Sequence, residues 1–143
     1  MPKFSNAGKA IIAQLHPDLQ LILNTVIIYY DITMLPSTIR TIYEQKQFFD
    51  SGASKTMDSM HLPRPFPEYG GQNYVCAFDC TPWVGKIDFD SEKGKREHYY
   101  MAGVIMTIAD RLFIDGKIKH KLRWGGRFNI GEGDLVHFEL ILG

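Results

Sequence analysis

Apolar residues recur at helical spacing along several stretches of the chain. Leu19, Ile22 and Val26 are spaced to share one face of a helix. Pro17 stands where a first helical turn accepts proline, so this helix is predicted over residues 17–29. The remaining predicted helices cover residues 7–15, 39–50 and 97–113, and the last of these is the longest.

Alternation of apolar and polar residues predicts short strands elsewhere. In residues 135–141, Val136 and Phe138 would face the core, whereas His137 and Glu139 would share the opposite face. The other predicted strands cover residues 32–35, 74–81 and 119–124. Helices and antiparallel strands that do not alternate regularly favour an α+β fold, in a single domain over residues 1–143.

Residues 51–72 show neither pattern. Pro63, Pro65 and Pro67 stand at every second position, which forbids a helix and fits poorly in a central strand. A structureless stretch of about twenty residues in a compact domain is usually functional or mobile.

Charge and composition narrow the function classes. The 16 Lys and Arg residues balance the 16 Asp and Glu residues, which argues against binding to nucleic acid or to an anionic membrane. The first residues lack the pattern of a signal peptide, and the apolar stretch of residues 19–30 is too short for membrane insertion. Cys76 and Cys80 would lie about 13 Å apart on a strand, too far for a disulfide, and are expected to be small buried hydrophobes.

Three polar residues offer the donor set of a metal site. His61, Asp79 and His137 supply two imidazoles and one carboxylate, which suits Zn²⁺ with an open position for water. Asp134 could take a proton from that water. Their spacing in the sequence does not by itself show that these residues lie close together in the fold. A lone histidine is more often a surface or core residue, and Asp79 could simply cap a turn.

Five short motifs occur in an order that resembles a known family. They are Thr38-Ile39-Arg40-Thr41, Ser59-Met60-His61, Ala77-Phe78-Asp79, Leu122-Arg123-Trp124-Gly125-Gly126 and Asp134-Leu135-Val136-His137. The chain resembles the zinc peptidases of the D-alanyl-D-alanine carboxypeptidase group. Within that group it is most similar to phage L-alanyl-D-glutamate endopeptidases, the endolysins that cut peptidoglycan stem peptides. The resemblance covers roughly residues 15–140.

The resemblance implies a small antiparallel sheet that carries the zinc site and is flanked by helices, as in the Hedgehog and D,D-peptidase folds. It makes His61, Asp79 and His137 the ligands of one zinc ion. It also makes Asp134 the catalytic base, and later the acid that protonates the leaving amine.

The resemblance also suggests roles for further residues, each with a structural alternative. Arg40 would stabilise an oxyanion or hold a substrate carboxylate, unless it is an exposed arginine at a helix start. Ser59 would bind substrate or orient His61, and Trp124 would line the substrate cleft or pack in the core. Glu139 would be a partner of His137 or a surface residue. His16, His98 and His120 match no family ligand and are expected to be surface or structural residues.

Three departures from the family pattern bear on the site and its substrate. His61 and Asp79 stand 18 positions apart, against about seven in the family, so residues 62–73 form a Pro/Gly-rich insertion between ligands. We expect residues 62–71 to form a flap at the edge of the cleft. The family glycine before Asp79 falls on Val75, and Arg127-Phe128 replaces an acidic residue and Trp after the Gly-rich loop (Gly125, Gly126, Gly131, Gly133).

The resemblance therefore predicts a zinc-dependent peptidoglycan endopeptidase, an endolysin that hydrolyses the L-Ala–D-Glu bond. The alternatives are a D,D- or L,D-carboxypeptidase of the same group, a non-catalytic zinc-binding module such as the Hedgehog signalling domains, and a metal-free globular domain.

We expect a monomer whose partner is the stem peptide. It would be made in the host cytoplasm and act on the periplasmic wall after a holin opens the membrane. Zero net charge leaves two modes of wall recognition: the cleft itself, or a basic cluster formed by Lys117, Lys119, Lys121, Arg123 and Arg127.

Overall fold

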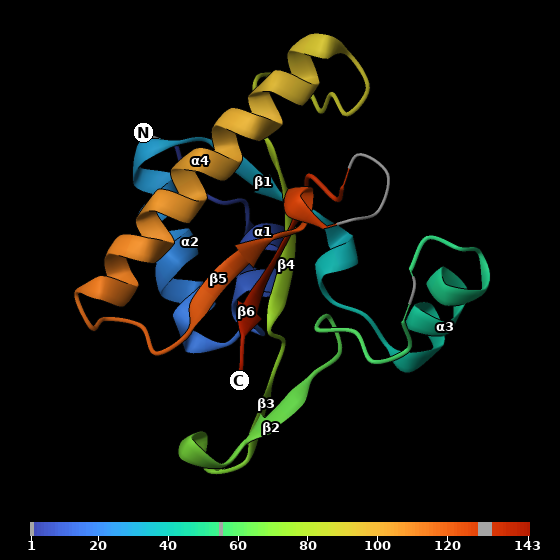
Figure 1. The fold of residues 1–143 in the computed structure, drawn as a ribbon, viewed down its shortest axis with the longest axis vertical. Helices are drawn as coiled ribbons and strands as arrows, with labels where there is room; N and C mark the ends of the chain where they lie inside the picture. Colours follow the sequence, from blue (N-terminus) through green and yellow to red (C-terminus); the bar gives the residue numbers. More distant parts are fainter. Residues whose placement is uncertain (1, 55, 129–132) are drawn as a thin grey trace.

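A four-stranded antiparallel sheet forms the centre of the computed structural model, which describes residues 2–54, 56–128 and 133–143. The strand order is β1-β4-β6-β5 (Figure 1). The strands are β1 (Ile32–Met34), β4 (Ala77–Pro82), β6 (His137–Ile141) and β5 (Lys121–Trp124). Because β4 lies between two other strands, all six of its residues are buried, including the polar Asp79.

Three helices lie on one side of this sheet (Figure 1). They are α1 (Asn6–Ile12), α2 (Pro17–Tyr29) and α4 (Glu92–Ile114). Helix α4 packs against α2, β4 and β5. The core contains the stacked rings of Phe78 and Phe138, whose centroids are 5.1 Å apart.

The other side of the sheet carries shorter elements. The 3-10 turn η1 (Pro36–Thr38) leads into α3 (Ile42–Asp50), which stands apart from the sheet (Figure 1). Strands β2 (Arg64–Phe66) and β3 (Gln72–Tyr74) form a hairpin around the 3-10 turn η2 (Pro67–Tyr69). A last 3-10 turn, η3 (Gly125–Arg127), follows β5.

The structure corrects several predicted boundaries. Helix α3 starts at Ile42 rather than at residue 39, because Thr41 and Glu44 form a reciprocal capping box. Helix α4 starts at Glu92, five residues before the predicted start, where Ser91 is the N-cap. The strand predicted over residues 74–81 is divided, since Val75 turns aside to pair with Leu15.

The proline-rich segment is more regular than the sequence suggests. Pro65 lies inside β2, opposite Asn73, in a two-stranded hairpin. An edge position tolerates proline because its missing N–H is not needed for a second partner. Residues 62–73, expected as an insertion, therefore form most of this hairpin. Of the Gly-rich loop, Gly131 lies outside the described residues.

Two further expectations concern membranes and cysteines. Within the described residues, no helix combines the length and the apolar character needed to cross a bilayer. Cys76 and Cys80 are both buried and free.

Candidate metal centre

Three side-chain atoms converge at one point of the sheet surface. The His61 Nε2 atom lies 3.0 Å from His137 Nδ1 and 3.3 Å from Asp79 Oδ1, and the His137 and Asp79 atoms are 3.2 Å apart. Ligand atoms at about 2.0–2.1 Å from Zn²⁺ in tetrahedral geometry are about 3.3 Å from one another. The triangle thus has the dimensions of a three-ligand face, and the three residues could hold a metal ion.

Hydrogen bonds on the far side of each ring direct the lone pairs into this triangle. The His61 Nδ1–H donates to the carbonyl oxygen of Thr38 at 3.0 Å, and the His137 Nε2–H donates to Glu139 Oε1 at 2.7 Å. Both acceptors lack a proton to give, so His61 Nδ1 and His137 Nε2 each carry an N–H, and the other nitrogen of each ring faces the triangle. Two ring nitrogens and a carboxylate oxygen at this separation form a donor set that a cation could bridge.

The strand register places two of the three residues. Asp79 on β4 stands directly opposite His137 on β6, so their side chains lie on the same face of the sheet. Ala77 stands opposite Glu139 in the same way, and its small side chain leaves room for the buried carboxylate of Glu139.

Thr38 in η1 ties His61 to this pair. Its carbonyl oxygen accepts from His61, and its hydroxyl both donates to the carbonyl of Asp79 and accepts from the Asp79 N–H, each at 3.0 Å. The His61 turn is held by its own backbone bond to Ser59 Oγ, at 3.1 Å. Fully buried Thr38 is thus a structural residue of the site that the sequence did not single out.

The protonation of the cluster follows from these contacts. Burial alone would lower the pKa of His137, but hydrogen bonds to Asp79 and Glu139 raise it to about 9. Burial opposes ionisation of Asp79, and hydrogen bonds from His137 and His61 nevertheless lower its pKa. The site therefore favours a positive charge at its centre, whether a proton or a metal ion supplies it.

A pocket of about 320 Å³ opens over the triangle, and Asp134 and Arg40 line it with His61 and His137. Asp134 lies exposed at the pocket rim, in a turn where its carbonyl oxygen accepts from the His137 N–H. Partial removal of the carboxyl group from water disfavours its ionised form, and the negative charge of Asp79 acts in the same direction. Both effects raise the pKa of Asp134. A raised pKa suits a group that must exchange protons near neutral pH.

Arg40 is fixed rather than free. Its guanidinium donates to the Ser37 carbonyl oxygen at 2.9 Å and to Gln45 Oε1 at 3.0 Å, and forms an ion pair of 3.4 Å with Asp79 Oδ2. It also lies 4.4 Å from the centroid of the Phe48 ring. The guanidinium is thus held rigidly at the pocket, and the alternative of an exposed helix-start arginine does not describe it.

Arg40 also lines a second pocket of about 750 Å³ on the side of the hairpin. Leu62, Pro63, Arg64 and Pro65 form part of its wall. The segment expected as a flap therefore lines a pocket next to the one over the triangle, and Arg40 lies in the wall of both pockets.

Two predicted substrate-binding residues lie elsewhere. The Ser59 hydroxyl accepts the backbone N–H of His61, which fits the alternative of orienting that ligand. The Trp124 indole N–H donates to the Leu135 carbonyl oxygen at 2.9 Å, and the ring packs edge-on against Tyr99. Neither residue lines the pocket over the triangle in the described part of the chain.

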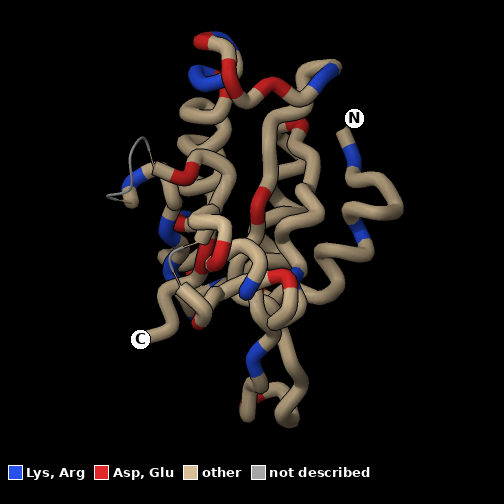
Figure 2. The backbone as a smooth tube through the Cα atoms, turned by 90° about the vertical axis from the view of Figure 1, so that its right-hand side faces the viewer, with Lys and Arg blue, Asp and Glu red and all other residues tan. Residues whose placement is uncertain are grey.

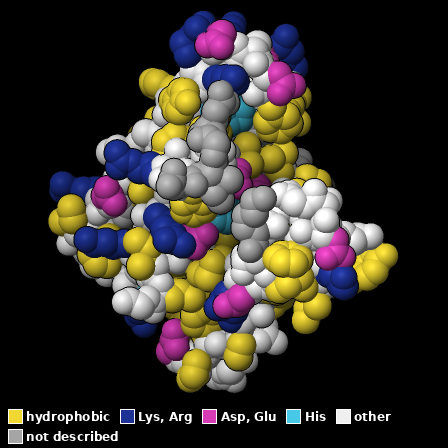
Figure 3. Space-filling model, turned by 45° about the vertical axis from the view of Figure 1, so that its right-hand side comes forward, with side chains coloured by type: hydrophobic (Ala, Val, Ile, Leu, Met, Phe, Trp, Pro, Cys, Tyr) yellow, Lys and Arg dark blue, Asp and Glu magenta, His cyan; other side chains and the backbone are white. Residues whose placement is uncertain are grey.

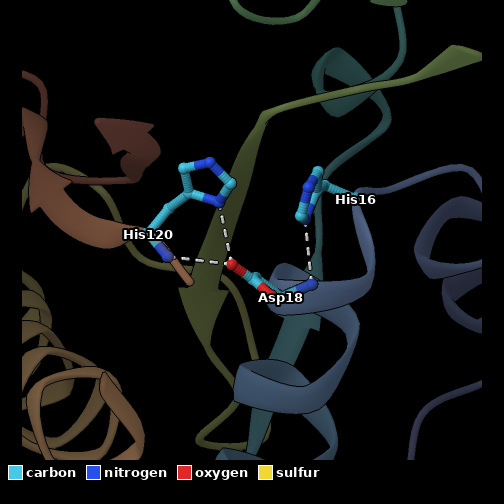
Figure 4. A group of neighbouring side chains, drawn as sticks. All are labelled: His16, Asp18 and His120. Carbon is cyan, nitrogen blue, oxygen red and sulfur yellow. Dashed lines mark hydrogen bonds and ion pairs between the residues drawn. The ribbon is translucent and has the colours of Figure 1, made fainter. Parts of the chain in front are cut away.

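A second group of potential ligands consists of His16, Asp18 and His120 (Figure 4). Asp18 Oδ2 already accepts three N–H groups, from the Lys119 backbone, the His120 backbone and His120 Nδ1, at 2.9–3.0 Å. His16 Nδ1 accepts the Asp18 N–H at 3.0 Å. These bonds join α2 to the segment that leads into β5, a structural role of the kind expected for His16 and His120.

Comparison with known proteins supports the fold. No protein-family model matches the chain, and no curated protein matches its sequence. Among solved structures, the α+β fold is shared with a peptidase. That structure is the Serratia marcescens L-Ala D-Glu endopeptidase ChiX, which matches with a TM-score of 0.70 over 97% of this chain and 90% of that chain, at 18% identity. The predicted fold class, a single α+β domain with an antiparallel sheet and flanking helices, is confirmed.

Proposed function

We propose that this protein is a zinc-dependent endopeptidase that hydrolyses the L-Ala–D-Glu bond of the peptidoglycan stem peptide. One observation carries the proposal: two imidazole nitrogens and the Asp79 carboxylate converge beside Asp134. The fold is that of a protein named as an L-Ala D-Glu endopeptidase, and the order of motifs in the sequence supports the same activity.

The proposed roles follow from the positions of the residues. Zn²⁺ held by His61, Asp79 and His137 would supply a Lewis acid for the scissile carbonyl and a water of lowered pKa. Asp134 at the rim takes a proton from the attacking water and returns it to the leaving amine. The fixed guanidinium of Arg40 holds an anionic oxygen of the substrate, with no reorganisation needed at the moment of reaction.

The test combines metal analysis with product analysis. Purified protein is expected to contain one zinc ion, and His61→Ala is expected to lose it, whereas His120→Gln in the second group keeps it. Digestion of peptidoglycan should release fragments with new L-Ala carboxyl and D-Glu amino ends, identified by mass spectrometry.

Asp134→Asn separates catalysis from metal binding. It should retain zinc and lose about 10²- to 10⁴-fold in rate. The matched control is Asp110→Asn, an exposed carboxylate on α4 outside both pockets, which should keep its rate. Fragments that lose only a terminal D-alanine would show a carboxypeptidase, and zinc without turnover would show a binding module.

We further propose, from the sequence resemblance, that the protein is a phage endolysin that reaches the wall after a holin opens the membrane. Cells that express it should lyse only when their inner membrane is permeabilised. Lysis without permeabilisation would contradict this route.

A further inference from the structure

The positive charge of this neutral chain is concentrated in one segment. Residues 116–128 contain five Lys and Arg residues and no Asp or Glu, so the remaining chain carries 11 basic against 16 acidic residues. All five basic residues are exposed. We call them the basic strip: Lys117, Lys119, Lys121, Arg123 and Arg127.

The strip has an alternating pattern that places its charges on one side of the chain. Between them, Ile118 and Leu122 are buried. In β5, Lys121 stands opposite Ile141 and Arg123 opposite Glu139, so both basic residues start from the sheet face that carries Glu139 and His137. Of the strip, Lys121 and Arg123 therefore share the sheet face of the candidate metal centre.

The strip reaches that centre through direct contacts. Arg123 Nη2 donates to Glu139 Oε2 at 2.9 Å, and Glu139 in turn holds His137. The Arg123 guanidinium also lies 5.1 Å from the Phe128 ring centroid, and the Phe128 ring is 5.7 Å from that of His137. Only one residue thus separates the end of the strip from a candidate ligand.

The lysines of the strip keep their charges available. Within the described residues, Lys117, Lys119 and Lys121 form no ion pair with a carboxylate. The Lys119 and Lys121 ammonium groups lie 5.9 Å and 5.4 Å from the ring centroids of Tyr69 and Phe113. Figure 3 shows several Lys and Arg side chains on the left of the molecule, and Figure 2 shows Lys and Arg mixed with Asp and Glu at the top of the view.

We propose that the basic strip is a binding site for the carboxylate-rich peptides of a cross-linked wall polymer, and that it holds the polymer while one stem peptide enters the pocket. This inference rests on the proposed function for the identity of the polymer. Exposed cations in a row attract a polyanion and raise its local concentration. Because the strip ends beside the pocket, a flat membrane bound there would cover the pocket mouth, which favours a flexible polymer as the occupant.

The test compares two variants that lose the same charge. Lys119→Gln/Lys121→Gln alters the strip, and Lys86→Gln/Lys93→Gln alters exposed lysines outside the strip, one of them in the first turn of α4. Binding to insoluble peptidoglycan is measured by co-sedimentation, which needs no turnover. At low ionic strength the strip variant should bind roughly five- to twenty-fold more weakly than wild type, and the control within about two-fold. In about 0.5 M salt the difference should vanish.

Chemical amidation of the polymer's carboxyl groups should weaken wild-type binding to the level of the strip variant. Equal binding by wild type and strip variant would overturn the proposal. So would strip-dependent binding to phosphatidylglycerol vesicles with unchanged binding to peptidoglycan, since the partner would then be a membrane.

Hydrolysis of a short soluble stem peptide distinguishes the two proposals. Because such a peptide does not span the strip, the strip variant should cleave it within about two-fold of the wild-type rate. Strip-dependent binding of peptidoglycan by a wild-type protein that cleaves neither substrate would leave the strip established and refute the endopeptidase.

Discussion

Glu139 connects the candidate ligand His137 to the surface cation Arg123. Burial opposes its ionisation, but hydrogen bonds from His137 and Arg123 lower the pKa of Glu139 and keep it a carboxylate. An anionic acceptor on Nε2 fixes the ring orientation and makes Nδ1 a stronger donor to a metal. The alternative of a surface glutamate does not fit, since the residue is buried.

Replacing Glu139 should therefore weaken metal binding. We expect Glu139→Gln to lower zinc affinity by about 10- to 100-fold, measured by competition with a chromophoric chelator. Arg123→Gln, which leaves the bond between Glu139 and His137 intact, should have a smaller effect. Equal loss in both variants would show that Arg123, rather than the carboxylate, positions the ring.

At the scale of residues, the sequence predicted which side chains could bind a metal, but it did not show that they lie close together in the fold. Alternation in β6 correctly put His137 and Glu139 on one face. Asp79 meets His137 only because β4 and β6 pair in one register, and no local pattern encodes that register. Thr38 acts through its backbone carbonyl and a hydroxyl, so its residue type carried no signal of its role.

At the scale of secondary-structure elements, the η3 turn packs directly against two residues of the site, Asp134 and His137. A Cβ atom on Gly125 would lie 2.6 Å from the Asp134 carbonyl oxygen and 3.0 Å from His137 Cβ. The Gly125 carbonyl oxygen also accepts the Asp134 N–H at 2.8 Å. The η3 turn can therefore position Asp134 only when residue 125 has no side chain.

Gly125→Ala should displace Asp134 and His137 and lower the peptidase rate by about 10²-fold, because small misplacements of reacting groups are costly. Gly103→Ala is the matched control. A Cβ atom on this helical glycine meets nothing within 4 Å, so the change should leave the rate unaltered and stabilise α4 by about 0.5–1 kcal/mol. Rates and denaturant unfolding measure both effects. A normal rate in Gly125→Ala would contradict the role of this turn.

Elements with a local signal were predicted and elements fixed by tertiary contacts were not. Helix α2 has its predicted bounds because Pro17 and the apolar face both mark it. The first turn of α4 was missed, since its residues are charged and its start depends on the Ser91 cap. The T-x-x-E pattern at Thr41 could have located the start of α3. The β2–β3 hairpin was missed because its edge position, not its sequence, makes Pro65 acceptable.

For the whole molecule, a bound metal would connect three distant parts of the chain. His61 lies in a turn before the hairpin, Asp79 in the central strand and His137 in the last described strand. A ligand that binds only the folded state stabilises it by mass action.

Removal of metal should accordingly lower the melting temperature. At zinc concentrations about 100 times the Kd, binding contributes about 2.7 kcal/mol, or roughly 5–10 °C for a domain of this size. Calorimetry with and without a chelator measures the shift. His61→Ala should melt at the same temperature in both conditions, and a chelator effect in that variant would place the stabilising ion elsewhere.

The strand register has a consequence for how the protein is made. The two histidines of the triangle are 76 positions apart, and Asp79 precedes His137 by 58. A nascent chain therefore cannot assemble the three donors until residue 137 has left the ribosome and β6 has paired with β4. A chain that ends before residue 137 lacks the third donor, so the candidate metal centre forms only with the completed sheet.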